Sequence, residues 1–483
     1  MSETAIASTS PRESSMVWVI VAIVCIGSFM GQLDASITQL VLPALEREFA
    51  ISIGEVSWVA VIFLLAVSVM LPIFGRLADM YGRKKLYVSG FLIFIAGSAL
   101  CGFAPGIGWL VAARALQAIG AAMLSANSVA IIVSVAGEKM RGKALGFQAA
   151  VQAVGLCAGP TVGGWIVDAL DWRWVFWVNV PFGIAGTLLA WLIVPETSAG
   201  NSDSRFDMFG ALLLVPALGT IMLAINQVGS WGLLSVGVIG NAVAGVVLLA
   251  GLVSWERRSP DPLIPLALFG KWSFASGNLV SLLANIILFG LFFLMPFAFE
   301  RVFGESALSA GLRLTTIPIA LGILAPISGA LSDRIGNRAL CSGGMLVVFF
   351  GLLLLSLQLG AARPDLLMIT VSLIVVGIGE GAFFAPNNNA IMGSAPVAQA
   401  GEAGSLMIVT RDLGTSVGIA MAASLLSWNL RMLIGGSSTL NASEADLTHA
   451  IRMVVIVLAG LALVAAGMSW ARPRGRRAAA ASR

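Results

Sequence analysis

Charged side chains are scarce in this sequence of 483 residues. Aspartate, glutamate, lysine and arginine together make up 11% of it, and hydrophobic residues reach 58%. Ordinary soluble domains carry roughly 25% charged residues. Apolar runs of about 20 residues, each able to cross roughly 30 Å of hydrocarbon as a helix, recur along the whole sequence. This composition excludes a soluble globular protein and predicts an all-α polytopic membrane protein.

Residues that bind metals or form disulfides are also few. His449 is the only histidine, and Cys25, Cys101, Cys157 and Cys341 lie in separate apolar runs. We therefore expect neither a disulfide framework nor a metal site, and interpret the cysteines as small buried hydrophobic residues. An intramembrane enzyme would need a catalytic cluster, and no grouping of histidine, cysteine and aspartate appears.

The stretch from Gly137 to Ala144 nearly spells a nucleotide-binding loop, G-x-x-x-x-G-K-[ST]. Ala144 lacks the hydroxyl that would bind magnesium, and no strand precedes the stretch. We expect no ATP hydrolysis and no cofactor. The net charge of +4 is explained by membrane topology and does not indicate a nucleic-acid partner.

Breaks between the apolar runs predict fourteen transmembrane helices. They lie near 16–43, 52–75, 86–104, 107–133, 142–168, 173–194, 207–227, 232–255, 272–299, 308–332, 339–360, 365–392, 403–431 and 448–470. An even number places both termini on one side, and that side carries most of the 28 basic residues. The positive-inside rule then predicts cytoplasmic termini, in the inner membrane of a bacterium.

A charged turn occurs twice, at 75–85 and more weakly at 329–338. Two such turns between apolar helices indicate two related halves. The copies are 254 residues apart (329 minus 75). Six spans with their connections account for roughly 200 residues, so two additional helices fit between the halves.

The two turns resemble the loop signature of the major facilitator superfamily that joins spans 2 and 3. The stretch at 110–120 resembles the family's arginine motif in span 4, and the stretch at 155–164 resembles the span 5 motif of its antiporters. The span 1 stretch at 33–38 with Pro43 and the tryptophan-rich stretch at 171–181 resemble motifs of its fourteen-span drug:proton antiporters. The resemblance implies the major facilitator fold, two six-helix bundles with two linking helices. The sequence departs from it at Ala118, where a glycine is usual.

This organisation divides the chain into five parts. We expect a cytoplasmic arm at 1–15, the first bundle at 16–194, a linker with two spans at 195–271, the second bundle at 272–470 and a basic cytoplasmic tail at 471–483. The tail is interpreted as a topology determinant, with binding to anionic lipid as the alternative.

The charged turn is predicted to act as a conformational latch. Gly75 and Gly82 permit close approach and tight turning, while Asp79 and Arg83 can form charge contacts specific to one conformation. Asp333 and Arg334 are their counterparts in the second copy. The alternative is a topology signal alone.

Asp34 is the first candidate for proton coupling. It lies about nine residues, or roughly 13 Å, from the outer end of span 1, where an unpaired carboxylate is expensive. Arg114 lies at a similar depth in span 4 and shares a helical face with Gln117. We expect the guanidinium to hold Asp34 ionised until cargo or a conformational change separates them. A static hydrogen bond at Asp34, or a permanent ion pair, is the structural alternative.

Span 5 carries small residues at four-residue spacing. Gly155, Gly159 and Gly163, with Gly164 alongside, predict close helix packing, and Pro160 invites a kink. Gln148 and Gln152 extend the same face into the predicted cavity.

Glu380 is the candidate acid of the second half. It lies mid-span, on a face with Phe384 and Asn387, and would bind a proton or meet a cationic cargo. Arg411 and Asp412 lie inside span 13. Adjacent helical residues point in different directions, so we expect each to pair with another helix in a structural or gating network.

These features predict a proton-driven exporter of a lipophilic small molecule, with cations favoured, that works by alternating access as a monomer in lipid. The resemblance associates such a protein with multidrug efflux and antibiotic resistance. An uptake symporter, an exporter of one metabolite and a non-transporting receptor are the alternatives. A periplasmic adaptor remains open as a partner.

Overall fold

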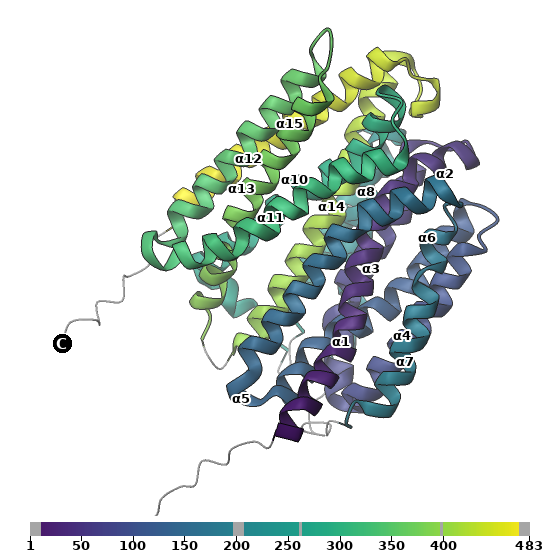
Figure 1. Ribbon diagram of the computed structural model, residues 1–483. Coiled ribbons are helices and arrows are strands. Elements are labelled where there is room, and N and C mark those ends of the chain that lie inside the picture. Colours follow the sequence, from purple (N-terminus) through teal and green to yellow (C-terminus); the bar gives the residue numbers. More distant parts are fainter. Residues whose placement is uncertain (1–10, 197–206, 260–262, 397–398, 473–483) are drawn as a thin grey trace, which may run out of the picture.

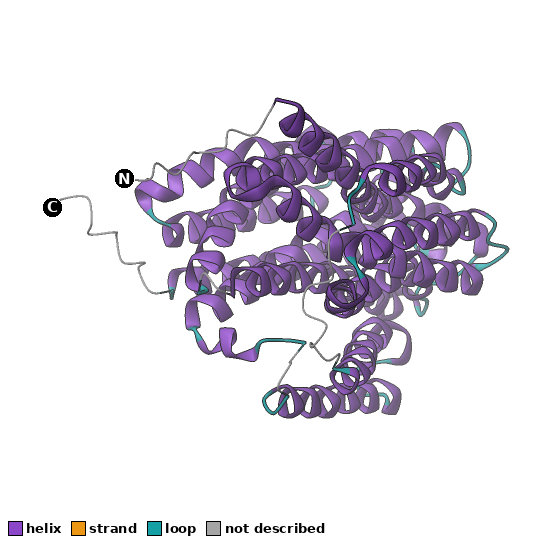
Figure 2. Cartoon of the chain, turned by 90° about the horizontal axis from the view of Figure 1, so that it is seen from below, coloured by secondary structure: helices purple, strands orange, loops and turns teal. Residues whose placement is uncertain are grey.

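The structure, a computed structural model, describes residues 11–196, 207–259, 263–396 and 399–472. Fourteen helical segments in these ranges are long and apolar enough to cross a membrane. They are arranged as an elongated helical bundle (Figure 1), and no strand occurs in the part of the chain that the structure describes (Figure 2). The predicted all-α fold with fourteen spans is confirmed.

The helices follow the predicted order. Their bounds are α1 Pro11–Ile37, α2 Leu42–Phe49, α3 Ile53–Tyr81, α4 Arg83–Gly102, α5 Ile107–Ala169, α6 Trp174–Trp177, α7 Asn179–Ile193, α8 Met208–Trp231, α9 Val236–Glu256, α10 Trp272–Phe297, α11 Ala307–Ile335, α12 Asn337–Leu359, α13 Leu366–Ser394, α14 Ala400–Ile434 and α15 Glu444–Trp470. Short helices occur at η1 Thr38–Val41, η2 Leu266–Gly270, η3 Ala298–Val302 and η5 Thr439–Asn441. Helix α5 contains two spans, Ile107–Gly137 and Met140–Ala169, which meet at a kink where Gly137 has φ 59°.

Successive spans run in opposite directions, so the molecule has two faces. We call the face where α1 begins and α15 ends the terminal face, and the face where α2 meets α3 the distal face. Of the predicted arm at 1–15, residues 1–10 lie outside the described residues and 11–15 belong to α1. Of the predicted tail at 471–483, residues 473–483 lie outside the described residues.

The two charged turns have the same backbone form at the terminal face. Gly82 ends α3 with φ 101°, and Gly336 ends α11 with φ 88°. Each donates its N–H to the carbonyl four residues earlier, on Ala78 and Ser332. A side chain is strained at such φ values, so glycine is required at both positions. The shared geometry agrees with two related halves.

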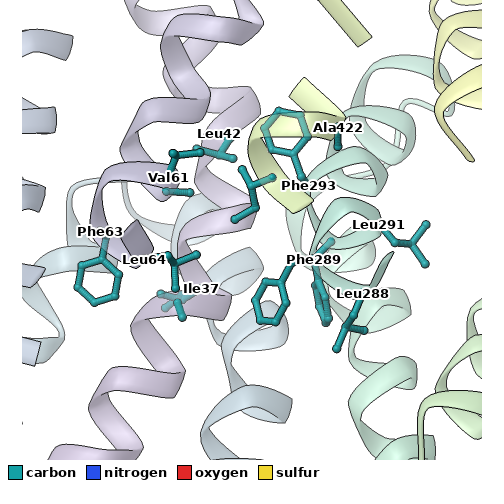
Figure 3. Close-up of a cluster of buried hydrophobic side chains, with 14 of the residues drawn as sticks. Ile37, Leu42, Val61, Phe63, Leu64, Leu288, Phe289, Leu291, Phe293 and Ala422 are labelled. Carbon is teal, nitrogen blue, oxygen red and sulfur yellow. The ribbon is translucent and has the colours of Figure 1, made fainter. Parts of the chain in front are cut away.

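The first six spans (α1–α7) and the last six (α10–α15) meet across a buried hydrophobic cluster. Figure 3 shows Ile37 and Leu64 of the first six spans facing Phe289 and Phe293 of α10. None of these side chains exposes more than 7% of its surface. The cluster lies next to η1, the 3-10 turn that follows the helix bearing Asp34.

The two sets of spans are packed tightly at the distal end of α5 and α11. A Cβ added to Gly164 would lie 2.2 Å from the Ala307 carbonyl oxygen, and one on Gly311 would lie 2.1 Å from the Pro160 oxygen. Nearer the terminal face, one glycine of each helix has free space beside it. Among the described residues, nothing lies within 4 Å of a Cβ built on Gly146 or Gly322. The distal ends of α5 and α11 are therefore closed against each other in this conformation.

The two additional spans lie beside both sets. Asn226 of α8 donates to Ser57 Oγ of α3 at 2.8 Å, and the Gly229 N–H donates to Ser424 Oγ of α14 at 3.1 Å. Helix α9 packs on α8, where a Cβ on Gly245 would lie 2.4 Å from Ile221. Val236 of α9 is 90% exposed, as expected for a helix that faces lipid.

Candidate functional site

Three helices bring a polar cluster into the interior of the first six spans. Asp34 lies in the last turn of α1, and Arg114 and Gln117 lie one turn apart on α5 and therefore on one face. Asn179 is the first residue of α7. Asp34 and Gln117 have no exposed surface, and Arg114 and Asn179 are each 1% exposed.

The Asp34 carboxylate accepts hydrogen bonds from all three partners. Arg114 Nη1 donates to Oδ2 at 2.5 Å, while Gln117 Nε2 and Asn179 Nδ2 donate to Oδ1 at 2.8 and 3.1 Å. Arg114 also donates to Gln117 Oε1 at 2.8 Å and to the Val59 carbonyl at 3.0 Å. The predicted contact between Asp34 and Arg114 is thus present in the structure.

Aromatic rings surround the guanidinium. Arg114 Cζ lies 4.1 Å from the centre of the Phe63 ring and 5.5 Å from that of Phe176. These contacts favour the cation, and the dry surroundings strengthen its attraction to Asp34. The arrangement can hold an ionised carboxylate in the membrane interior, and the arrival of a proton on that carboxylate would remove the attraction.

Asn179 and Ser98 were not among the residues predicted from the sequence. Ser98 Oγ of α4 donates to the Phe176 carbonyl and accepts from Gln117 and Asn179 at 3.2 and 3.4 Å. The sequence signal for Asn179 was its position as an amide side chain at the start of an apolar span, in the tryptophan-rich stretch. No spacing along one helix reveals which neighbouring helix such an amide faces.

The glycine stripe of span 5 packs against the helix that carries Asp34. A Cβ on Gly159 would lie 1.8 Å from Ser36 Oγ, and one on Gly155 would lie 2.9 Å from the Phe29 carbonyl oxygen. Gly163 approaches Ile37 in the same way. This agrees with the predicted close packing, which here fixes the position of Asp34.

The two predicted glutamines of span 5 differ in their surroundings. Gln148 is 3% exposed and donates to Ser28 Oγ and Ser128 Oγ, both at 2.9 Å, so it ties α1 to both spans of α5. Gln152 is half-buried. Gln152 is therefore the more accessible of the two.

Glu380 lies midway along α13 and has no exposed surface. Within the described part of the chain, neither of its carboxylate oxygens has a hydrogen-bond partner. Glycines on both sides bring neighbouring helices close, since a Cβ on Gly379 would lie 2.7 Å from the Gly344 carbonyl oxygen. An ionised carboxylate is very expensive in such surroundings, so the neutral acid is the form that fits.

The residues expected to share the Glu380 face are held differently. Asn387 is fully buried, donates to the Gly277 carbonyl at 3.2 Å and accepts from Arg472 Nη1 at 2.7 Å. It therefore ties α10, α13 and the end of α15 together. Phe384 is half-buried and packs on Phe383, with ring centres 5.5 Å apart.

The expectation that Arg411 and Asp412 pair with other helices is wrong. Arg411 Nε donates to Asp412 Oδ1 at 3.1 Å. The arginine side chain is long enough to curl back past one residue, which an argument from backbone directions alone does not consider.

Within the charged turn, Arg83 contacts other residues of the first six spans. Arg83 forms an ion pair with Asp79 at 2.9 Å and donates to the Ala130 carbonyl at 3.5 Å. Gly75 adjoins open space, and Arg334 is exposed. The side chain of Asp333 lies outside the described residues. A latching role for this turn stays a prediction.

The described residues offer no group of side chains that could ligate a metal ion. Among the described residues, no three histidine, cysteine or acidic side chains come together to hold an ion. The four cysteines are free thiols, three of them buried.

The amino-acid sequence of this chain is similar to those of known proteins. A sequence profile of the Major Facilitator Superfamily matches residues 24–419 and 274–482. The chain is 30% identical over 413 residues to the riboflavin transporter RibZ of Clostridioides difficile, covering 86% of this chain and 89% of that protein. It is 32% identical over 406 residues to the multidrug resistance protein Stp of Mycobacterium tuberculosis, covering 83% and 74%. For the multidrug transporter protein MdtP of Bacillus subtilis, identity is 30% over 412 residues, covering 83% and 74%.

Solved structures share the fold. A bacterial homologue of the human lysosomal transporter Spinster, inward-facing and unoccupied, has a TM-score of 0.68 at 17% identity and covers 96% of this chain and 97% of its own. A D-xylose–proton symporter has a TM-score of 0.66 at 16% identity and covers 95% and 99%. At such identities the likeness concerns the fold alone.

Proposed function

The chain belongs to the major facilitator superfamily, and we propose that it is a proton-coupled exporter of lipophilic small molecules, cations included. The observation that carries this proposal is the buried ion pair between Asp34 and Arg114. Multidrug transporters among its relatives support efflux as the direction and lipophilic compounds as the cargo. No cofactor enters the proposal, because the proton gradient supplies the energy.

The ion pair links proton binding to movement. When Asp34 takes up a proton, Arg114 loses its counter-charge, and the hydrogen bonds from Gln117 and Asn179 weaken because charge-assisted bonds are the stronger kind. The helices that carry these groups, α1, α5 and α7, are then free to shift. Each proton moved through 100 mV supplies about 2.3 kcal/mol, enough to change the balance of two conformations substantially.

Glu380 is proposed to exchange its proton for a cationic cargo. The carboxyl group is buried without a partner among the described residues, so it gains more from a cation nearby than an already paired carboxylate does. Release of its proton when such a cargo arrives would exchange one positive charge for another. Asp34, which is already paired with Arg114, would then serve proton coupling rather than cargo binding.

We further propose that the terminal face is cytoplasmic. Basic residues gather in the loops at that face, including Arg83, Lys84, Lys85 and Lys271, as the positive-inside rule requires. The distal face, where α5 and α11 are packed together in this structure, would then be the outer face. A monomer in a bacterial inner membrane is sufficient for this cycle.

A second candidate function is the transport of one metabolite. The riboflavin transporter RibZ aligns with 86% of this chain at 30% identity, a likeness comparable to that of the multidrug transporters. Proton-coupled uptake of a flat, polar heterocycle would use the same Asp34–Arg114 pair.

Counterflow in proteoliposomes separates these candidates. Vesicles loaded with unlabelled ethidium or with riboflavin are diluted into the labelled compound, first without a gradient and then with a pH gradient of either sign. A drug antiporter accumulates ethidium when the lumen is acidic. A symporter accumulates its cargo when the outside is acidic. A receptor shows no counterflow with either compound.

A further inference from the structure

The distal face holds contacts between the two sets of spans that the proton mechanism does not use. Glu46 of α2 has no exposed surface. Its Oε1 accepts from Ser438 Oγ at 2.8 Å and from the Thr439 N–H at 2.7 Å, and its Oε2 accepts from Thr439 Oγ1. Each of these donors belongs to the loop between α14 and α15, so a charge of the first six spans is bound by the last six.

Asp168 makes a second contact of the same kind. It lies at the distal end of α5, and its two carboxylate oxygens accept from the N–H groups of Ala307 and Leu308 at 3.1 and 2.8 Å. These groups form the first turn of α11, where the helix dipole favours a negative charge. Because Gly164 has no side chain, the two helices can approach this closely.

We propose that Glu46 and Asp168 form a distal latch, defined by these two carboxylates and the N–H and O–H groups that they bind. The latch stabilises the state that is closed at the distal face. An alternating transporter must also open that face, and both carboxylates would then separate from their partners. Breaking the latch is therefore a required step of the cycle, whatever the cargo and the direction of transport.

The neighbouring ion pair between Arg47 and Glu300 contributes less to this closure. Its atoms lie 3.6 Å apart, and the Arg47 side chain is 60% exposed, a situation in which ion pairs contribute little. The latch carboxylates differ because each accepts at least two hydrogen bonds across the boundary, Glu46 from a buried position and Asp168 from an exposed one. Loss of one charged acceptor is expected to change the ratio of closed to open molecules about tenfold.

Distance measurements on the full chain test the latch. Spin labels are attached to cysteines replacing Pro105 and Ala362, which are exposed turn residues at the distal face of the two sets of spans. In nanodiscs without cargo or gradient, Glu46→Gln and Asp168→Asn should each raise the ratio of long to short distances about tenfold. Glu55→Gln is the matched control, because the Glu55 carboxylate at the same face binds Ser52 within its own helix cap and should leave the distances unchanged.

A second variant keeps the test decisive if Glu46→Gln fails to fold. Thr439→Val with Ser438→Ala removes two of the donors while the Glu46 carboxylate stays, and should shift the distances in the same direction. Unchanged distances in the folded latch variants, or an equal shift in Glu55→Gln, would overturn the latch. Because no transport is measured, this outcome is separate from the fate of the proposed proton-coupled export.

Discussion

Asp34 and Glu380 are both fully buried in the membrane interior, but their surroundings are opposite. Asp34 accepts hydrogen bonds from three side chains, one of them the guanidinium of Arg114. Glu380 has no partner for either oxygen among the described residues. The first site fits an ionised carboxylate and the second a neutral acid, so the two acids are expected to respond differently to the same kind of substitution.

Replacing Asp34 by asparagine should abolish proton-driven efflux and also destabilise the protein. The amide cannot balance Arg114, and a buried charge left without its partner costs about 3–5 kcal/mol. Dye efflux in a pump-deficient bacterium and the thermal unfolding temperature in detergent measure the two effects. Asp446→Asn, which alters the contact that Ser443 Oγ makes with the Asp446 carboxylate at the cap of α15, should change neither. Normal efflux in Asp34→Asn would refute the coupling role.

Glu380→Gln should abolish efflux of cationic dyes without loss of stability. Glutamine keeps the shape and the neutrality of the protonated acid, so no charge is stranded, but it cannot release a proton. The same two measurements apply, with the exposed Glu402→Gln as the control. A large fall in unfolding temperature would show that Glu380 is ionised and paired, contrary to this interpretation.

Asn179→Ala should slow transport about tenfold or more, because one hydrogen bond to a charged carboxylate is lost. The effect should appear in the maximal rate and leave the cargo concentration for half-maximal rate nearly unchanged, since Asn179 contacts Asp34 and not the cargo. Thr187→Ala on the same helix is the control, because its hydroxyl donates to the Gly183 carbonyl within that helix. An unaltered maximal rate would remove Asn179 from the site.

Gly159→Ala should destabilise the protein by about 1–3 kcal/mol. The added Cβ would lie 1.8 Å from Ser36 Oγ, which forces α5 away from the helix that carries Asp34. Gly146→Ala adds the same methyl group to the same helix in open space and should be neutral or slightly stabilising. Equal unfolding temperatures for both variants would contradict the packing role of the glycine stripe.

The spans and the Asp34–Arg114 pair could be predicted from the sequence for simple reasons. Apolar length determines a span, and the rise per residue of a helix puts Asp34 and Arg114 at similar depth. A charge at that depth needs a partner. Both arguments depend only on the number of residues along one helix, and that number can be read directly from the sequence.

Contacts that depend on helix rotation or side-chain conformation could not be predicted. Asn179 and Ser98 reach the site because α4 and α7 turn those faces toward α1. Arg411 curls back to Asp412, against the expectation from backbone directions. Glu46 lies between two predicted spans, and only the folded chain brings the loop at Thr439, nearly 400 residues away, to it.

Accumulation of a cationic dye by proteoliposomes under an imposed pH gradient, compared between the parent chain and Asp34→Asn, decides whether the Asp34–Arg114 pair couples transport to protons. The proposal predicts that the parent accumulates dye only when the lumen is acidic, and that Asp34→Asn does not accumulate it with either sign of gradient. Equal gradient-driven accumulation by the two proteins would contradict it.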